Sequence, residues 1–183
     1  RNPYSRSVSA FLNKFYVKHQ KVISSFEKLE PFARDFINDY NSYRVYDSTN
    51  YNISFIQYLE FVSYLILEKK SIDHHWDRQV PRFDGFKLVP DFIVKQESFD
   101  QDIKNLNAYF DLPDFVTIKR NSTTYSNDYI LSDSDFSHAS NFECRKQKIA
   151  LKYNNLINSQ SASLIKRIYS IDFEYFKYDK DSF

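Results

Sequence analysis

The opening stretch RNPYSRSVS carries two arginines and a serine at a spacing that suits the binding of an anion. The Asn-Pro pair after Arg1 can open a helix, since proline is favoured in the first turn. A helix start offers unpaired N–H groups to an anion, a guanidinium adds a fork of donors, and the Ser9 hydroxyl adds one more. Arg1, Arg6 and Ser9 are therefore a candidate phosphate site. Spacing alone favours the alternative, a surface helix with a solvated arginine.

Two adjacent histidines are the candidates for a catalytic base, because an imidazole titrates near neutral pH. The alternative, which the sequence slightly favours, is that one ring of His74 and His75 stacks or hydrogen-bonds structurally beside Trp76. Trp76 is either a platform for a sugar ring or a core residue. Adjacent histidines have poor spacing for metal ligands on a helix, and His19 and His138 are isolated in the sequence. We therefore expect no metal site.

Lys95 and Glu97 lie at the end of DFIVK, a short apolar segment that is predicted to be a buried strand. Functional groups of α/β folds gather at the ends of strands. Glu97 is therefore a candidate contact to an acceptor or to the catalytic base. The alternative for this pair of charges is a structural ion pair.

Hydrophobic residues recur at helical spacing in several stretches, and these are the elements that must position the candidate residues. The predicted helices cover residues 4–18, with an extension towards 29, and residues 32–40, 54–70, 98–113 and 161–179. Ser54 is the expected cap of the third helix, which has the clearest apolar face.

Two short apolar segments, 91–95 and 115–120, are predicted as strands. Strands and helices alternate along the chain, which indicates an α/β layer. Two strands do not make a stable open sheet, so we expect further strands before Arg1. The polar segment 120–141 is expected to be a loop.

The composition argues against several classes of protein. The 183 residues suit one domain, and the formal net charge of +1 gives no general attraction to nucleic acid or to an anionic membrane. No stretch approaches the ~20 apolar residues of a membrane span. Cys144 is the only cysteine, which excludes an internal disulfide and favours a reducing compartment. Gly85 is the only glycine, so the residue that builds phosphate-cradling loops is nearly missing.

Several blocks of the sequence together resemble a known family. RNPYSRSVSAFLNKF resembles the segment R(D/N)PxxRxxSAYxNKF, which binds the 3′-phosphate of the sulfate donor 3′-phosphoadenosine 5′-phosphosulfate (PAPS). The family is that of the carbohydrate sulfotransferases that include the chondroitin and dermatan 4-O-sulfotransferases and their bacterial relatives. The other blocks are SFIQYLEFVSYL, DHHWDRQ, VPDFIVKQESFDQDIKNL and LIKRIYSIDFEYFKYD. They resemble its phenylalanine-rich helix, its HWxxQ segment, its YDFIGKxExLxxDxxxL block and its closing helix, in the same order.

The resemblance implies the P-loop-like α/β fold of PAPS-dependent sulfotransferases, with a parallel sheet flanked by helices. In that family a strand and a phosphosulfate-binding loop of PKxGSTS-like pattern precede the arginine segment. Residues 1–183 contain no such pattern. We therefore expect a single partial domain that is mostly helical and lacks the N-terminal strand and the 5′-phosphosulfate loop.

The resemblance also assigns roles to residues. Those implied to bind the cofactor are Arg1, Ser9, Arg6 and Arg120, with Arg6 on the phosphate or on the acceptor and Arg120 in a loop closing over the nucleotide. The expected catalytic base is His75 or His74, although in some relatives the base lies upstream of the arginine segment. The expected acceptor contacts are Trp76, Lys95 and Glu97. No metal is required.

The activity that the resemblance implies is transfer of a sulfuryl group from PAPS to a hydroxyl of a carbohydrate, by in-line displacement. The alternative is a truncated, non-catalytic sulfotransferase-like binding module. A nucleic-acid binder is disfavoured by the net charge and by aromatic residues set at helical core spacing. Animal members work in the Golgi lumen and bacterial ones in the cytoplasm, and the single cysteine favours the cytoplasm. A membrane link is expected only through an anchor outside these residues.

Overall fold

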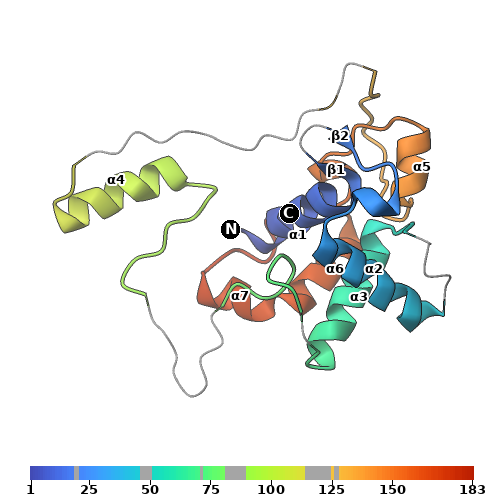
Figure 1. The fold of residues 1–183 in the computed structure, drawn as a ribbon. Coiled ribbons are helices and arrows are strands. Elements are labelled where there is room, and N and C mark those ends of the chain that lie inside the picture. Colours follow the sequence, from blue (N-terminus) through green and yellow to red (C-terminus); the bar gives the residue numbers. More distant parts are fainter. Residues whose placement is uncertain (19–20, 46–50, 71, 81–89, 114–124, 126–127) are drawn as a thin grey trace.

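The computed structural model describes residues 1–18, 21–45, 51–70, 72–80, 90–113, 125 and 128–183, and this part of the chain is mostly helical (Figure 1). Its α-helices are α1 (Pro3–Phe11), α2 (Pro31–Arg44), α3 (Phe55–Leu67), α4 (Phe99–Phe110), α5 (Asn141–Lys146), α6 (Ser159–Ile168) and α7 (Ser170–Tyr175). Short 3-10 turns cover Phe26–Lys28 and Tyr153–Asn155. The strands of the described part are β1 (Val17–Lys18) and β2 (Lys21–Val22), which pair antiparallel.

The first helix begins where the sequence predicts but ends earlier. The Asn2 side chain accepts a hydrogen bond from the backbone N–H of Tyr4 at 2.9 Å, and Pro3 occupies the first turn. After α1 the chain widens into a π-helical turn, Leu12–Tyr16, and then enters β1. The extension of the helix towards residue 29 is therefore wrong. The buried Tyr16 hydroxyl donates to the carbonyl of Ile149 at 2.5 Å, which fixes the end of the turn.

The third helix confirms the clearest prediction from the sequence. Ser54 Oγ accepts from the backbone N–H of Gln57 at 3.2 Å, and Gln57 Oε1 accepts from the N–H of Ser54 at 2.9 Å. This reciprocal capping box satisfies two donors at the helix start. The helix α3 packs against α6 in the middle of the fold (Figure 1).

The core is built largely from aromatic rings. Trp76 is only 2% exposed and lies among Phe15, Phe36 and Tyr58, with a ring-centroid distance of 4.7 Å to Phe36. The edge-to-face contact with Phe36 is the arrangement that aromatic quadrupoles prefer. A ring so deeply buried offers no face to a sugar, so the structure favours the core alternative for Trp76.

The C-terminal stretch 161–179, predicted as one helix, is interrupted at Tyr169, whose backbone angles (φ −110°, ψ 26°) are not helical and which lies between the end of α6 and the start of α7. The buried Tyr169 hydroxyl donates to the carbonyl of Trp76 at 2.7 Å. The break turns Asp172 and Phe173 into the interior and leaves Ile171 exposed.

The expected strand over 91–95 is wrong, because this segment has no regular secondary structure, is not buried and pairs with no strand in the described part of the chain. The second expected strand, 115–120, lies outside the described residues. The parallel sheet of the expected α/β fold therefore stays a prediction.

The helix α4 stands apart from the main helical body (Figure 1). Large apolar side chains are exposed along and after it, among them Phe99, Tyr109 and Phe110. Across the described ranges, no helix combines the length and the apolar character that crossing a bilayer requires.

Candidate functional site

The backbone of Arg1 is held by the side-chain amide of Gln79. The backbone nitrogen of Arg1 donates to Gln79 Oε1 at 3.1 Å, and Gln79 Nε2 donates to the carbonyl of Arg1 at 2.7 Å. A side-chain amide that both accepts from and donates to one residue fixes the orientation of that residue as well as its position. Gln79 closes the DHHWDRQ block, so two of the blocks noted in the sequence meet here.

Glu97 holds the next residue of the chain. One carboxylate oxygen accepts from the backbone N–H of Asn2 at 2.9 Å, and the other accepts from the Tyr178 hydroxyl at 3.1 Å. Partial burial acts to raise the pKa of Glu97, but these hydrogen bonds outweigh it and hold the pKa below its usual range. With both oxygens engaged, Glu97 acts as a brace for the start of α1.

Lys95 does not pair with Glu97 within the described residues. Its ammonium donates to the carbonyl of Lys177 at 3.2 Å and lies 4.6 Å from the centroid of the Tyr178 ring. Lys95 and Glu97 therefore both contact the segment after α7, one through a backbone carbonyl and the other through Tyr178. The ion pair between them that was considered as an alternative is not formed.

A buried carboxylate stands behind Gln79. Asp172, which is 0% exposed, accepts from the backbone N–H of Gln79 at 3.0 and 2.9 Å and from that of Val80 at 3.1 Å. Burial raises the pKa of Asp172, against the hydrogen bonds and the charges of Arg6 and Arg78. Asp172 was not among the residues chosen from the sequence. The signal that could have revealed it is an acidic residue in the middle of an apolar helical stripe.

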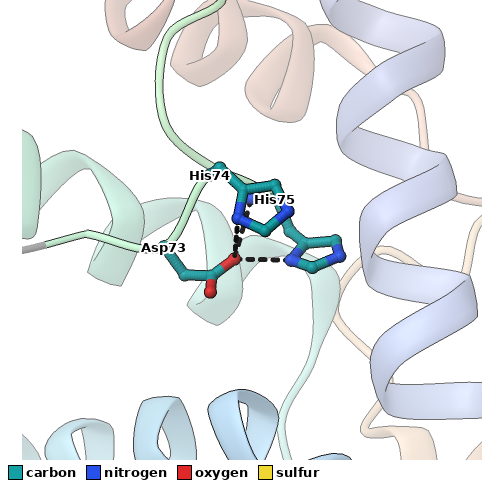
Figure 2. A group of neighbouring side chains, drawn as sticks. All are labelled: Asp73, His74 and His75. Carbon is teal, nitrogen blue, oxygen red and sulfur yellow. Dashed lines mark hydrogen bonds and ion pairs between the residues drawn. The ribbon is translucent and has the colours of Figure 1, made fainter.

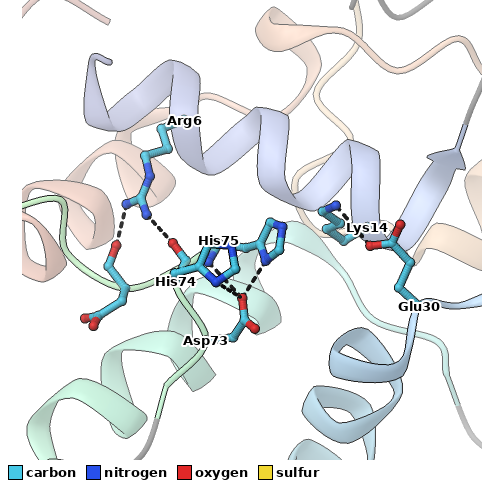
Figure 3. A network of polar contacts seen from close by, with 7 residues as sticks. Arg6, Lys14, Glu30, Asp73, His74 and His75 are labelled. Carbon is cyan, nitrogen blue, oxygen red and sulfur yellow. Dashed lines mark hydrogen bonds and ion pairs between the residues drawn. The ribbon is translucent and has the colours of Figure 1, made fainter.

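Arg6 is committed to the backbone of the histidine turn. Its guanidinium donates to the carbonyl of Asp77 through Nη1 and to the carbonyl of His74 through Nη2, the latter at 2.8 Å. Figure 3 shows Arg6 reaching from α1 towards the turn that carries His74 and His75. Both terminal nitrogens are engaged, so this geometry favours a clamp between α1 and the turn over a contact to phosphate.

Arg1 and Ser9 are differently placed. Arg1 is exposed, Ser9 is partly exposed on α1, and within the described residues neither the guanidinium nor the hydroxyl makes a hydrogen bond or ion pair. A rise of about 1.5 Å per residue puts Ser9 about 9 Å along the axis from Pro3. Arg1 must therefore extend along α1 for the two side chains to share one phosphate. Arg120, the remaining cofactor candidate, lies outside the described residues.

His74 and His75 share one carboxylate. Asp73 Oδ1 accepts from the backbone N–H of His75 at 2.9 Å and lies 2.5 Å from the Nδ1 of His75 and 3.5 Å from that of His74 (Figure 2). The His75 ring also stacks on Phe32 at a centroid distance of 4.3 Å and an angle of 11°. The His74 side chain is 83% exposed. His75 is therefore the more firmly held of the two.

The contact with Asp73 determines what His75 can do chemically. Burial acts to raise the pKa of Asp73, but the hydrogen bonds from His75 outweigh it, so the pKa lies below its usual range. An ionised carboxylate at Nδ1 keeps the ring proton on that nitrogen, which leaves Nε2 as the acceptor. The stack on Phe32 equally provides the structural role that was the alternative for a histidine here.

At the start of α1 an exposed guanidinium and a partly exposed hydroxyl lie beside a backbone that Gln79 and Glu97 hold, and both are groups that can donate to an oxyanion. A family model described as the sulfotransferase family matches residues 1–179. The chain therefore belongs to the sulfotransferase family. Neither a search of curated proteins nor one of solved structures finds a match to it.

Proposed function

We propose that the protein transfers a sulfuryl group from PAPS to a hydroxyl of a carbohydrate, and that the start of α1 binds the 3′-phosphate of this donor. One observation carries the proposal. Gln79 holds the backbone of Arg1 at two points, while the Arg1 guanidinium, which feels the charge of Glu97, makes no hydrogen bond or ion pair among the described residues. Membership of the sulfotransferase family supports sulfuryl transfer as the reaction.

The donor atoms at this site fit the group. A 3′-phosphate is a dianion that takes charge-assisted hydrogen bonds from a guanidinium and a hydroxyl, which Arg1 and Ser9 supply. When bound, PAPS supplies an activated sulfuryl group for in-line displacement. Arg1 and Ser9 orient the nucleotide, because a reaction of this kind depends mainly on alignment of the two partners.

The proton of the acceptor hydroxyl needs a base, and we assign this role to Nε2 of His75. Asp73 holds the other ring nitrogen and Phe32 fixes the plane of the ring, so the accepting nitrogen has a defined direction. His74 is the weaker candidate because its exposed ring has fewer fixed contacts. The carbohydrate nature of the acceptor rests on the resemblance of the sequence blocks to carbohydrate sulfotransferases.

The test compares two nucleotides in the protein's natural full-length chain. Arg1→Ala or Ser9→Ala should weaken binding of 3′-phosphoadenosine 5′-phosphate by about 1.5–3 kcal/mol, the range for a hydrogen bond to a charged group. Binding of adenosine 5′-phosphate, which lacks the 3′ group, should barely change in isothermal titration calorimetry. Arg44→Ala and Ser42→Ala, exposed positions near the end of α2, are matched controls that should change neither affinity. Equal losses for the two nucleotides would overturn the assignment.

A further inference from the structure

The turn at residues 73–77 brings three ligand atoms together. One carboxylate oxygen of Asp73 and one ring nitrogen from each of His74 and His75 lie within 4.8 Å of one another. Figure 2 shows both rings directed at the same carboxylate. The expectation of no metal site rested on the spacing of adjacent residues in a helix, whereas these residues form a turn. In a turn, consecutive side chains can converge.

We propose that Asp73, His74 and His75 form a binding site for a divalent transition-metal cation of the Zn²⁺ type. The ligands are a carboxylate oxygen of Asp73 and the Nδ1 atoms of the two histidines. This site is separate from the proposed 3′-phosphate contacts, and its existence does not depend on the proposed activity.

The separations of the ligand atoms are close to those that a tetrahedral ion requires. Zn–N and Zn–O bonds of about 2.0–2.1 Å place ligand atoms about 3.3 Å apart. His74 Nδ1 lies 3.5 Å from Asp73 Oδ1, which already fits. His75 Nδ1 lies 2.5 Å from the same oxygen because they share a proton, so this pair must open by about 0.8 Å. When the cation binds Nδ1, solvent carries the ring proton to Nε2, because the neutral imidazole keeps one N–H. A metal-bound His75 therefore lacks the free Nε2 that the proposed base requires, so the two roles belong to different states of the protein.

Two of the three ligands are held in place before any ion binds. The carbonyl of Asp73 accepts from the backbone N–H groups of Trp76 and Asp77 at 3.1 and 3.0 Å, which closes the turn. Phe32 supports the ring of His75, and Arg6 ties the backbone of His74 to α1 (Figure 3). The exposed ring of His74 is the ligand that can rotate to complete the set.

The ligand chemistry decides which ions are favoured. Imidazole suits Zn²⁺, Cu²⁺ and Ni²⁺, whereas Mg²⁺ and Ca²⁺ prefer oxygen ligands. Three protein ligands leave a fourth tetrahedral position for water, as in open zinc sites. The guanidinium of Arg6, bonded to the carbonyl of His74, opposes the approach of a cation. We therefore expect weaker binding than at a closed structural site with four protein ligands.

The test is titration of the tag-free full-length protein with ZnCl₂ after removal of bound metal by a chelator. Calorimetry should show one saturable site in the absence of nucleotide, and Co²⁺ should give visible absorption typical of nitrogen and oxygen ligation. His74→Ala should lower Zn²⁺ affinity at least about tenfold, since it removes one of three ligands. Because His74 is exposed, this variant should fold normally. His75→Ala removes the stack on Phe32 and is therefore the less decisive variant.

The matched control is His138→Ala, because His138 is also exposed and contacts Gln160 at 3.0 Å, but belongs to no group of three possible ligands within the described residues. This variant should leave Zn²⁺ binding unchanged. Absence of saturable binding in the wild type, or equal affinity of the wild type and His74→Ala, would overturn the proposal. Binding of 3′-phosphoadenosine 5′-phosphate should be the same in His74→Ala and wild type, so failure of the metal site and failure of the nucleotide site are distinguishable.

Discussion

A guanidinium can serve a bound anion only if its donors are not already taken, and the two arginines of the opening block differ in this respect. Arg6 gives both terminal nitrogens to backbone carbonyls, and its cation lies 5.7 Å from the centroid of the Tyr169 ring. Arg1 keeps its guanidinium exposed while its backbone is fixed. An arginine near the start of a helix can serve either as a clamp on backbone carbonyls or as a donor to an anion, so the sequence cannot tell which role each arginine has.

Replacing Arg6 by lysine tests this division. Lysine keeps the charge but lacks the fork that reaches two carbonyls at once. We expect Arg6→Lys to lower the free energy of unfolding by about 1.5–3 kcal/mol in urea denaturation, the range for loss of a charged hydrogen bond. The ratio of affinities for 3′-phosphoadenosine 5′-phosphate and adenosine 5′-phosphate should stay as in wild type. Unchanged stability with a collapsed ratio would instead make Arg6 a phosphate ligand.

At the scale of elements, the start of α1 depends on three other parts of the fold. Gln79 comes from the segment after the histidine turn, Glu97 precedes α4, and Tyr178 follows α7. These contacts bind the backbone of residues 1 and 2 and leave the Arg1 side chain free to act. The exposed guanidinium therefore extends from a fixed backbone, which lowers the conformational entropy that binding of the proposed 3′-phosphate would cost.

Gln79 is thus a positioning residue for Arg1. Gln79→Ala removes two hydrogen bonds to Arg1 but keeps its own backbone N–H for Asp172. Affinity for 3′-phosphoadenosine 5′-phosphate should fall by about 1–3 kcal/mol, the sum of two neutral hydrogen bonds, with little loss for adenosine 5′-phosphate. In the Arg1→Ala background, Gln79→Ala should lower this affinity little further, because both substitutions act on the same contact between Arg1 and the phosphate. Equal weakening of both nucleotides would mean a merely structural role.

Helix starts could be predicted from the sequence more accurately than helix ends. The cap at Ser54 is local, since Gln57 lies one turn away. By contrast, the π-helical turn ends where the Tyr16 hydroxyl reaches Ile149, and α6 ends where that of Tyr169 reaches Trp76. Both partners are distant in sequence, so a repeating apolar pattern alone cannot show where the helix stops.

For the molecule as a whole, the core and the candidate site share the same supports. Trp76 lies in the aromatic core, and its carbonyl accepts from the Tyr169 hydroxyl. Val80, four residues after Trp76, donates its backbone N–H to Asp172. The sequence blocks that resemble the family contain the residues of the candidate site, and their arginines and histidines stand out by residue type. The contact between Gln79 and Asp172 cannot be predicted from the sequence pattern, because 93 residues separate them and only folding brings them together.

Asp172 also makes the stability of the whole fold depend on pH. Its buried carboxyl has a raised pKa, with Arg6 and Arg78 acting in the opposite direction, so the native state holds this proton more tightly than the unfolded state does. The stability it contributes is fully present below the unfolded pKa and is lost as pH rises through the folded pKa.

Asp172→Asn keeps an acceptor oxygen without this titration. In urea unfolding between about pH 4 and about pH 7, the free energy of wild type minus that of the variant should therefore decline as pH rises. Asp135→Asn is the control of opposite sign. Burial acts to raise the pKa of Asp135, but hydrogen bonds from Asn158 and Ser137 lower it, so its difference should rise with pH between about pH 2 and about pH 5 and then stay level. A rising difference for Asp172 as well would mean that the backbone N–H groups of Gln79 and Val80 favour the charged carboxylate more than burial opposes it.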